Sequence, residues 1–541
     1  MTKGFNVSFS EDNGNSQRIN TCLNWFTHNA LVHYSTPHGL EQYSGAAWGT
    51  RDVSQGPFEL FMSMQEYAKA KALLEEIYSH QYQETGTWPQ WFMFDQYATI
   101  QQEEAHGDIV VWPLKALADY LNTTGDISIL DVELPYTLAE EGFVNSESSF
   151  TLMHHVQTQV QHMLDNLVPG TSLSCYGDGD WDDTLQPANQ SLRENMVSGW
   201  TIPLTLQALK GMYQALQGSD HQDYAASLME LADKMESDYH HYLIKDGMIA
   251  GFIHFDRDEE GSVKQIEHLL HPSDQKTGIN YRLLPASRSI ISEVFDPEMA
   301  SSHMDIIKQN LVHPDGVRLM DKMAEYKAGK QSYFKRAELA ANLGREVGLQ
   351  YCHAHIRFIE ALCKLGDAEA VFDNLYKIIP VGIQDHVPNA ELRQSNAYFS
   401  SSDAKFNDRP TAYVNFDQVK NGEVAVKGGW RIYSSGPGIY VNQLISNVFG
   451  VRFAHNDLIL DPVISPRVGQ TKIQFELDEK PVTLVIDLVE GSHTPKAISI
   501  NDETVPFELT ENRYRSGGAK ISREWLLQRL SSEENTLHIS L

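Results

Sequence analysis

The sequence predicts a mainly α protein in which paired helices close into a barrel, followed by a small C-terminal antiparallel β domain. Across most of the 541 residues, apolar side chains recur at spacings of three and four. Short breaks that contain Gly and Asp separate neighbouring helices, which is typical of helical hairpins. After about residue 465 the pattern changes to the alternation of strands.

The clearest helical hairpin lies between residues 202 and 239. One apolar stripe runs from Ile202 to Leu216, a break follows at Gly218, and a second stripe runs from Tyr224 to Tyr239. We expect similar helices near residues 20–34, 58–78, 109–122, 150–166, 356–363, 371–378 and 437–449. No repeat of fixed length is present, so the hairpins do not form a simple solenoid. Long loops rich in Gly, Asp and Trp instead favour a closed barrel with its site at one mouth.

The C-terminal β domain is predicted from four short strands. Residues 473–477 alternate between apolar and polar, and residues 482–488 are rich in β-branched side chains. Residues 497–500 and 537–541 have the same character. The segments 245–330 and 380–430 are expected to be irregular, and loops of that length are usually functional or poorly ordered.

The charge balance excludes several classes of partner. Lys+Arg 42 against Asp+Glu 72 gives a net charge of -30, which would repel nucleic acid and anionic membrane surfaces. No apolar run reaches the length of a membrane span, and the N-terminus lacks the apolar stretch of a signal peptide. The four scattered cysteines form no CxxC pair, which argues against a disulfide scaffold or a zinc ribbon. These features predict a cytoplasmic protein without nucleic-acid or membrane partners.

The densest chemical signal is the acidic segment Tyr176–Asp183, which we call the acid loop. Alternate aspartates are typical of a calcium loop, but the sixth position is Asp183 rather than Gly and the twelfth is Asn189 rather than Glu. The EF-hand pattern therefore fails, which leaves a solvated acidic helix cap or a functional acid. In the functional interpretation, neighbouring charges and Trp181 keep one carboxyl protonated, so that it can protonate a glycosidic oxygen.

Two further clusters carry small and polar residues. In the segment 45–56, Arg51 and Asp52 form either a local ion pair or a pair of sugar-binding groups, with glycines that allow close approach of a ligand. In the segment 428–438, a turn rich in Gly and hydroxyl groups precedes a predicted helix. That turn is either a plain N-cap or a donor of backbone N–H groups to an anion.

The remaining cluster is the segment Arg345–His355. Its two histidines, His353 and His355, lie near Glu346 and could bind a metal, but no further ligand has a suitable spacing. We therefore predict no metal site.

Taken together, the four clusters resemble glycoside hydrolase family 94, the inverting β-glucoside phosphorylases. The family's Arg-Asp segment is similar to Trp48–Asp52, and its Asp-Trp-Asn-Asp motif is similar to Asp180–Asp183, with Asp in place of Asn at position 182. Its Lys/Arg-Glu-Asn-Gly-Gly-x-Tyr-x-His motif resembles Arg345–His353, and its late Trp-Arg…Ser-Gly turn resembles residues 430–436. The resemblance covers about residues 20–541, and the segments 47–52 and 433–440 are most similar to the branch that contains 1,2-β-oligoglucan phosphorylases.

The resemblance implies an (α/α)6 barrel over residues 1–464 and a C-terminal antiparallel β-sandwich over residues 465–541. The chain starts close to the barrel and lacks the family's N-terminal β-sandwich, so we expect it to be either a minimal member of the family or a fragment. It implies inverting phosphorolysis of β-linked gluco-oligosaccharides to α-glucose 1-phosphate, with Asp183 as general acid and inorganic phosphate as nucleophile. The implied sugar-binding residues are Arg51, Asp52, Gln55, Trp181, Arg345 and Glu346. The implied phosphate-binding residues are His353, Ser435 and Gly436.

Two other functions remain open at this point. An inverting glycoside hydrolase on the same barrel would need a base, for which Asp52, Asp108 or Glu346 are candidates. A non-catalytic carbohydrate-binding protein is the third alternative. The resemblance implies no cofactor other than phosphate as co-substrate, and it allows a homodimer.

Overall fold

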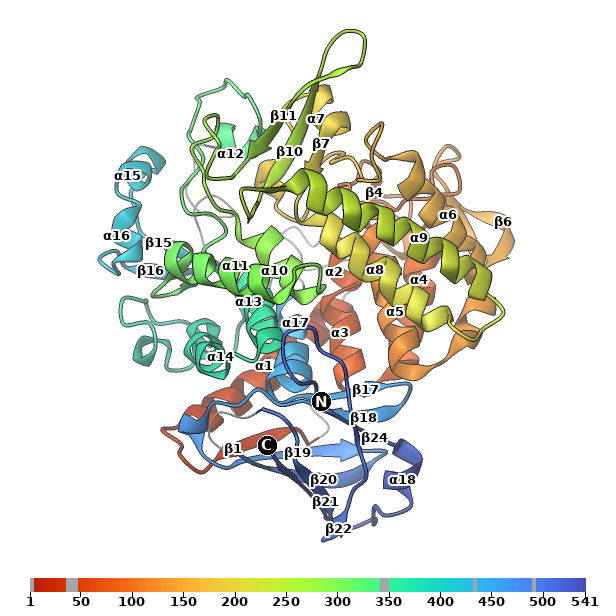
Figure 1. Cartoon of the computed structure of the whole chain (residues 1–541), viewed down its shortest axis with the longest axis vertical. Helices are drawn as coiled ribbons and strands as arrows, with labels where there is room; N and C mark the ends of the chain where they lie inside the picture. The colour runs from red at the N-terminus through yellow and green to blue at the C-terminus, as the bar shows by residue number, and fades with distance from the viewer. Residues whose placement is uncertain (1–3, 36–46, 341–349, 432–434, 489–492) are drawn as a thin grey trace.

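The computed structural model describes residues 4–35, 47–340, 350–431, 435–488 and 493–541. Within these residues, six helices form an inner ring (Figure 1). They are α3 (Gly56–Ser63), α5 (Val111–Thr124), α8 (Thr201–Leu216), α10 (Leu283–Ile291), α13 (Cys352–Leu365) and α17 (Gly436–Gln443). Each packs against the next, α17 returns to α3, and the short helix α2 (Thr50–Val53) joins α3 to α5. The predicted helical barrel is therefore confirmed.

A second set of helices packs outside this ring. It consists of α1 (Asn15–Ser35), α4 (Tyr67–Ser79), α6 (Leu152–Asp165), α9 (Gln222–Asp238), α11 (Pro297–Asn310) and α14 (Ala368–Leu375). The inner helices are buried on nearly all sides, and all nine residues of α10 are buried. The outer helices have an apolar stripe and a solvated face, as in α9, where four residues are buried. This difference between the two sets is what closes a two-layered barrel.

Two helical predictions are wrong in detail. The segment 58–78 forms two helices instead of one, because the chain turns at Gln65, whose φ is 56°. The segment 245–330, expected to be irregular, contains the inner helix α10 and the outer helix α11. Its two longest strands form a hairpin of β10 (Phe252–Arg257) and β11 (Val263–Leu269), to which β7 (Met196–Ser198) adds a third strand.

The C-terminal region contains a six-stranded sheet in the order β1-β19-β20-β25-β21-β22. Its strands are β1 (Asn6–Phe9), β19 (Thr471–Leu477), β20 (Lys480–Asp487), β25 (Asn535–Ser540), β21 (Ala497–Ile500) and β22 (Glu503–Thr504). The expectation of a purely antiparallel sheet is wrong for one pair, because β20 and β25 run parallel. The long crossover between them makes parallel pairing possible. The description of this region as a β-sandwich stays a prediction.

The N-terminal strand joins the same sheet, although it belongs to the segment expected to form the barrel. β1 pairs with β19, from Asn6 opposite Gln474 to Phe9 opposite Thr471. It lies beside the C-terminal strands at the lower end of the molecule (Figure 1). A four-stranded sheet follows the order β17-β18-β24-β23, with β17 (Val451–Ala454), β18 (Asp457–Leu460), β24 (Ala519–Ile521) and β23 (Glu508–Leu509).

Shorter elements connect these parts. The short helices are α7 (Gln190–Asn195), α12 (Lys335–Leu339), α15 (Arg409–Val414), α16 (Asp417–Lys420) and α18 (Arg523–Leu527). The short strands are β2 (Trp48–Gly49), β3 (Trp91–Phe92), β4 (Gln101–Gln102), β5 (Glu133–Leu138), β6 (Val144–Thr151), β8 (Ile244–Lys245), β9 (Met248–Ile249), β12 (Val312–His313), β13 (Gly316–Val317), β14 (Gln350–Tyr351), β15 (Phe399–Ala404) and β16 (Val426–Arg431). In the described part of the chain, every helix is too short or too polar to span a bilayer.

Candidate active site

The candidate site lies where the N-terminal ends of the inner helices meet. Asp108 precedes α5, Ser198 precedes α8 and Arg282 precedes α10. His353 lies in the first turn of α13, and Ser435 directly precedes α17. Helix N-termini present unpaired N–H groups and the positive end of the helix dipole. The barrel therefore directs several such ends toward one place, which favours negatively charged groups there.

The acid loop is fixed to this place by its first aspartates. Asp180 is fully buried and accepts two hydrogen bonds from Arg282 Nη2, both of 2.9 Å, and one of 2.6 Å from Ser198 Oγ. Gly179, at φ +140°, carries the chain past the His106 ring, and its carbonyl accepts from the Gly107 N–H at 2.9 Å. The anchored loop then presents its last aspartates to the mouth of the barrel.

Asp182 and Asp183 have different surroundings. Asp182 is fully buried, and its Oδ1 accepts from Thr184 Oγ1 at 2.6 Å, whereas Oδ2 has no hydrogen-bond partner among the described residues. Burial raises the pKa of Asp182 to about 6, against the opposing charge of Arg282. The Asp183 side chain is 31% exposed and begins the helical turn Asp183–Leu185. Of these two carboxyls, only Asp183 is accessible to a substrate.

Three cationic or ionisable side chains surround Asp183. Its Oδ1 lies 3.4 Å from His106 Nδ1 and 3.7 Å from Arg51 Nη1, and its Oδ2 lies 3.9 Å from Arg336 Nη1. Each of these distances is longer than a good charged hydrogen bond. The carboxyl is therefore held in a defined place without a tight ion pair.

Arg51 connects the acid loop to the rest of the barrel. Its Nε lies 3.2 Å from Asp108 Oδ2, and its Nη2 lies 3.0 Å from His106 Nδ1. Burial disfavours the charge of Arg51, but nearby carboxylates, Asp108 first among them, raise its pKa above the usual range. Arg51 thus remains a cation and forms an ion pair with Asp108.

The next residue, Asp52, belongs to the other half of the site. Its Oδ1 accepts from Ser435 Oγ at 3.1 Å, and Ser435 Oγ lies 3.4 Å from His353 Nδ1. Gly56 and Gly436 permit this contact: a Cβ on Gly56 would lie 2.5 Å from Ser435 Cα, and one on Gly436 would lie 2.1 Å from Tyr398 Oη. Adjacent residues of α2 therefore contact both the acid loop and the turn at Ser435 and Gly436, which we call the serine turn.

His353 is a neutral ring in this arrangement. Burial, followed by the charges of Arg357, Arg288 and Arg51, holds the pKa of His353 well below its usual range. Its Nε2 lies 3.1 Å from Gln55 Oε1, which also accepts from Arg357 Nη2 at 3.1 Å. Because that oxygen is an acceptor, Nε2 carries the proton and Nδ1 is an acceptor, so Nδ1 and Asp52 Oδ1 compete for the single hydroxyl proton of Ser435.

Trp181 lies between the two halves. The centroid of its ring lies 4.8 Å from the ring centroid of His353 and 4.8 Å from that of Tyr351, and both contacts are edge-on. The structure therefore brings together the predicted residues Arg51, Asp52, Gln55, Trp181, Asp183, His353, Ser435 and Gly436. Arg345 and Glu346 lie outside the described residues.

Other functional candidates were missed by sequence reasoning. His106, Arg282 and Arg336 contact the acid loop from segments far away in sequence. His106 stands two residues before Asp108, and this His-Gly-Asp step at a helix start was the one available signal. The two histidines of the HxH segment have separate partners, since His355 accepts from the Val317 N–H and lies 2.9 Å from the Asn374 carbonyl. In the described part of the chain, no group of three His, Cys, Asp or Glu residues could hold a metal ion.

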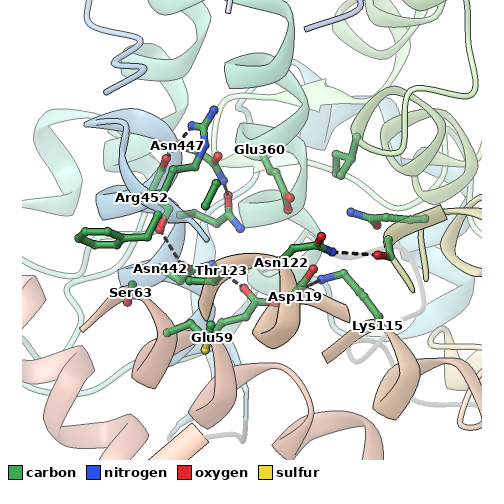
Figure 2. A pocket seen from close by; sticks show the side chains of 18 of the residues that line it. Glu59, Ser63, Lys115, Asp119, Asn122, Thr123, Glu360, Asn442, Asn447 and Arg452 are labelled. Atoms are coloured by element: carbon green, nitrogen blue, oxygen red, sulfur yellow. Dashed lines mark hydrogen bonds and ion pairs between the residues drawn. The ribbon is translucent and has the colours of Figure 1, made fainter. Parts of the chain in front are cut away.

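A cavity of about 580 Å³ lies at the opposite mouth of the barrel from the candidate site. We call it the basal cavity (Figure 2). It is lined by the C-terminal parts of the inner helices and by β17, and its cations are paired, as Lys115 with Asp119 at 2.6 Å and Arg357 with Glu59 at 2.5 Å. The positive charges of this cavity are therefore balanced by carboxylates that also line it.

A helical barrel with an acid loop and a histidine–serine pair at one mouth defines the class of this protein, and the comparisons give its family. The chain belongs to glycoside hydrolase family 94: the catalytic-domain model of the glycosyl hydrolase 94 superfamily matches residues 42–411. A glycoside phosphorylase C-terminal domain model matches residues 450–540. The family resemblance inferred from the motifs is thus confirmed.

Curated relatives match most of this chain. A 1,2-beta-oligoglucan phosphorylase of Listeria innocua is 49% identical over 95% of this chain and 46% of its own length. A solabiose phosphorylase of Paenibacillus borealis is 23% identical over 68% of this chain and 44% of its own. The chain spans less than half the length of these relatives. The solved structure of alpha-L-rhamnosidase from Dictyoglumus thermophilum covers 96% of this chain and 49% of its own, with 12% identity and a TM-score of 0.48.

Proposed function

We propose that this protein catalyses inverting phosphorolysis of β-linked gluco-oligosaccharides, 1,2-β-glucans being the preferred class, and releases α-glucose 1-phosphate. The observation that carries the proposal is the joint position of the accessible Asp183 and the His353–Ser435 pair. Arg51 and Asp52 connect the two, and Trp181 lies between them. The relative named as a 1,2-beta-oligoglucan phosphorylase supports the substrate class.

In the proposed reaction, Asp183 protonates the oxygen that leaves the cleaved glucose, while phosphate attacks the anomeric carbon from the opposite face. One C–O bond breaks as the other forms, so the configuration inverts. Phosphate is already nucleophilic and needs no base. It needs donors and positive charge instead, which Ser435, the start of α17 and the neighbouring inner-helix N-termini provide.

The hydrolase alternative has less support. Asp108 is fully buried and accepts from Trp112 Nε1 at 2.9 Å while pairing with Arg51, so it has no room to activate water. Asp52 accepts from Ser435, and Glu346 lies outside the described residues. A cytoplasmic location, a homodimer and the absence of a cofactor remain expectations from the sequence.

The test is product formation from a 1,2-β-gluco-oligosaccharide with and without inorganic phosphate. We expect glucose 1-phosphate in the α configuration, detected by 31P and 1H NMR, only when phosphate is present. Asp183→Asn should reduce the rate by about 10²–10⁴-fold, because an amide cannot donate the proton. Asp178→Asn is the matched control, since Asp178 lies in the same loop but pairs with Arg193. Reducing sugar released without phosphate, or full activity of Asp183→Asn, would contradict the proposal.

A further inference from the structure

A second, much smaller cavity lies between the candidate site and the basal cavity. It shares Gln55, Trp181 and His353 with the site, and it shares Ile291 and Arg357 with the basal cavity. The volume open to the centre of a water-sized particle is about 10 Å³. That is room for about one such particle. We call it the axial cavity.

Among the described residues, the lining of the axial cavity contains two arginines and no acid. Arg288 and Arg357 line it together with Trp112, Trp181 and Trp200. Arg357 is ion-paired with Glu59 and Glu360, but both of these carboxylates line the basal cavity and not the axial cavity.

Each of the two arginines has a buried donor without an acceptor. Among the described residues, the Nε of Arg288 and the Nε of Arg357 have no hydrogen-bond partner. Arg288 is 2% exposed, donates to Gln207 Oε1 at 3.0 Å and forms no ion pair with the described residues. Burial and the nearby Arg357 lower the pKa of Arg288 to about 10, so it remains charged at neutral pH.

Buried charged donors that lack an acceptor are costly, and two like charges beside one cavity add repulsion. An acceptor with a negative charge would relieve both penalties. A phosphate group is much larger than the space, whereas a monatomic anion is close to the size of a water molecule. The lining and the volume therefore select for a small, spherical anion.

We propose that the axial cavity binds a monatomic anion of the halide class, chloride in solution, held between the guanidinium groups of Arg288 and Arg357. The site is separate from the proposed phosphate position at Ser435, although His353 borders both. The proposal does not depend on phosphorolysis, because it concerns binding and not turnover.

The direct test is a crystal of the full chain grown in sodium bromide, with data collected at the bromine absorption edge. We expect an anomalous peak in the axial cavity within hydrogen-bond distance of both arginine side chains. A peak should be missing in Arg288→Met and present in Arg452→Met, a control arginine that lines the basal cavity and pairs with Asp461. Ordered water alone, or phosphate in the cavity, would overturn the proposal.

A solution test needs no crystal. The melting temperature is measured in rising sodium chloride, with sodium gluconate added to keep the ionic strength constant. For the wild-type chain we expect a saturable increase of about 1–3 °C, as for a ligand that binds the native state only. Arg452→Met should behave alike, and Arg288→Met should lose the response. If the melting temperature does not depend on chloride in the wild-type chain, the site is refuted, whether or not Arg288→Met folds.

Discussion

Arg51 and Asp52 are neighbours in sequence, yet their side chains contact different halves of the candidate site. Arg51 lies near Asp183 of the acid loop, and Asp52 accepts from Ser435 before α17. Sequence patterns could indicate the acid loop and the serine turn, because each is a dense local cluster. They could not indicate Arg282 or Arg336, since each is a single residue brought in by the fold.

At this scale, Asp182 gives a prediction for the dependence of stability on pH. Its folded pKa of about 6 lies above the ordinary value of 3.8, so between these values the native state holds a proton that the unfolded chain has released. The free energy of unfolding is therefore not reduced by Asp182 at low pH, where this residue is protonated in both states. It falls as the pH rises from 3.8 through about 6. Asp182→Asn, which restores the family's Asn, should be more stable than the wild type at pH 7 by about 1–3 kcal/mol.

The measurement is urea unfolding of the two proteins at pH 4.5 and pH 7. Thr184→Val is the control for the neighbouring hydrogen bond, because it removes the donor to Asp182 Oδ1 and should destabilise the protein at both pH values. An equal free energy of unfolding for Asp182→Asn and the wild type at both pH values would exclude this role of Asp182.

Long helices with a clear apolar stripe were predictable from sequence, and the short helix α10 was not. The segments of α8 and α9 show clear stripes, and both helices were expected close to their observed bounds. α10 was missed, since it has only nine residues, contains Pro285, and buries its polar residues along with its apolar ones. The break between α3 and α4 was missed for another reason: it depends on one left-handed residue, Gln65, that carries no sequence signal.

The contact between α3 and α17 gives a prediction at the scale of elements. A Cβ on Gly438 would lie 2.1 Å from the carbonyl oxygen of Gly56, so Gly438→Ala must push the two helices apart. We expect a loss of stability of about 1–3 kcal/mol and reduced phosphorolysis, because Ser435 moves with α17. Thermal unfolding and initial rates measure the two effects.

Gly211→Ala is the matched control for this substitution. Gly211 lies in the inner helix α8, and its Cβ would meet Ala118 Cβ at 3.2 Å, a contact that small shifts can relieve. We expect a smaller loss of stability and an unchanged rate. Wild-type stability in Gly438→Ala would show that the two helices do not need this close approach.

The whole molecule is joined across its ends by β1. This strand precedes the first helix of the barrel but completes a sheet made from residues after 470. Such pairing between distant segments could not be read from a four-residue strand, because the short pattern Asn6–Phe9 has no distinctive composition. The parallel pair β20–β25 was unpredictable for the same reason, since register and direction depend on the partner strand.

At this scale we predict that the barrel and the C-terminal sheet unfold together. Val7 is 1% exposed, so Val7→Asp buries a charge in the β1–β19 pair. It should destabilise the chain by about 3 kcal/mol or more and shift a single calorimetric transition to lower temperature. Ser8→Asp, on the exposed face of the same strand, should have little effect. Two separate transitions in Val7→Asp would mean that β1 does not couple the two parts.

The common direction of the inner helices has a consequence for how such a protein can diversify. The groups proposed to hold phosphate, His353 and Ser435, stand at helix starts, which the barrel cannot rearrange without losing its packing. Arg336 and the hairpin β10–β11, by contrast, belong to insertions between barrel helices. Exchange of those insertions could alter the sugar that is accepted while the nucleophile stays the same, so the two specificities can evolve separately.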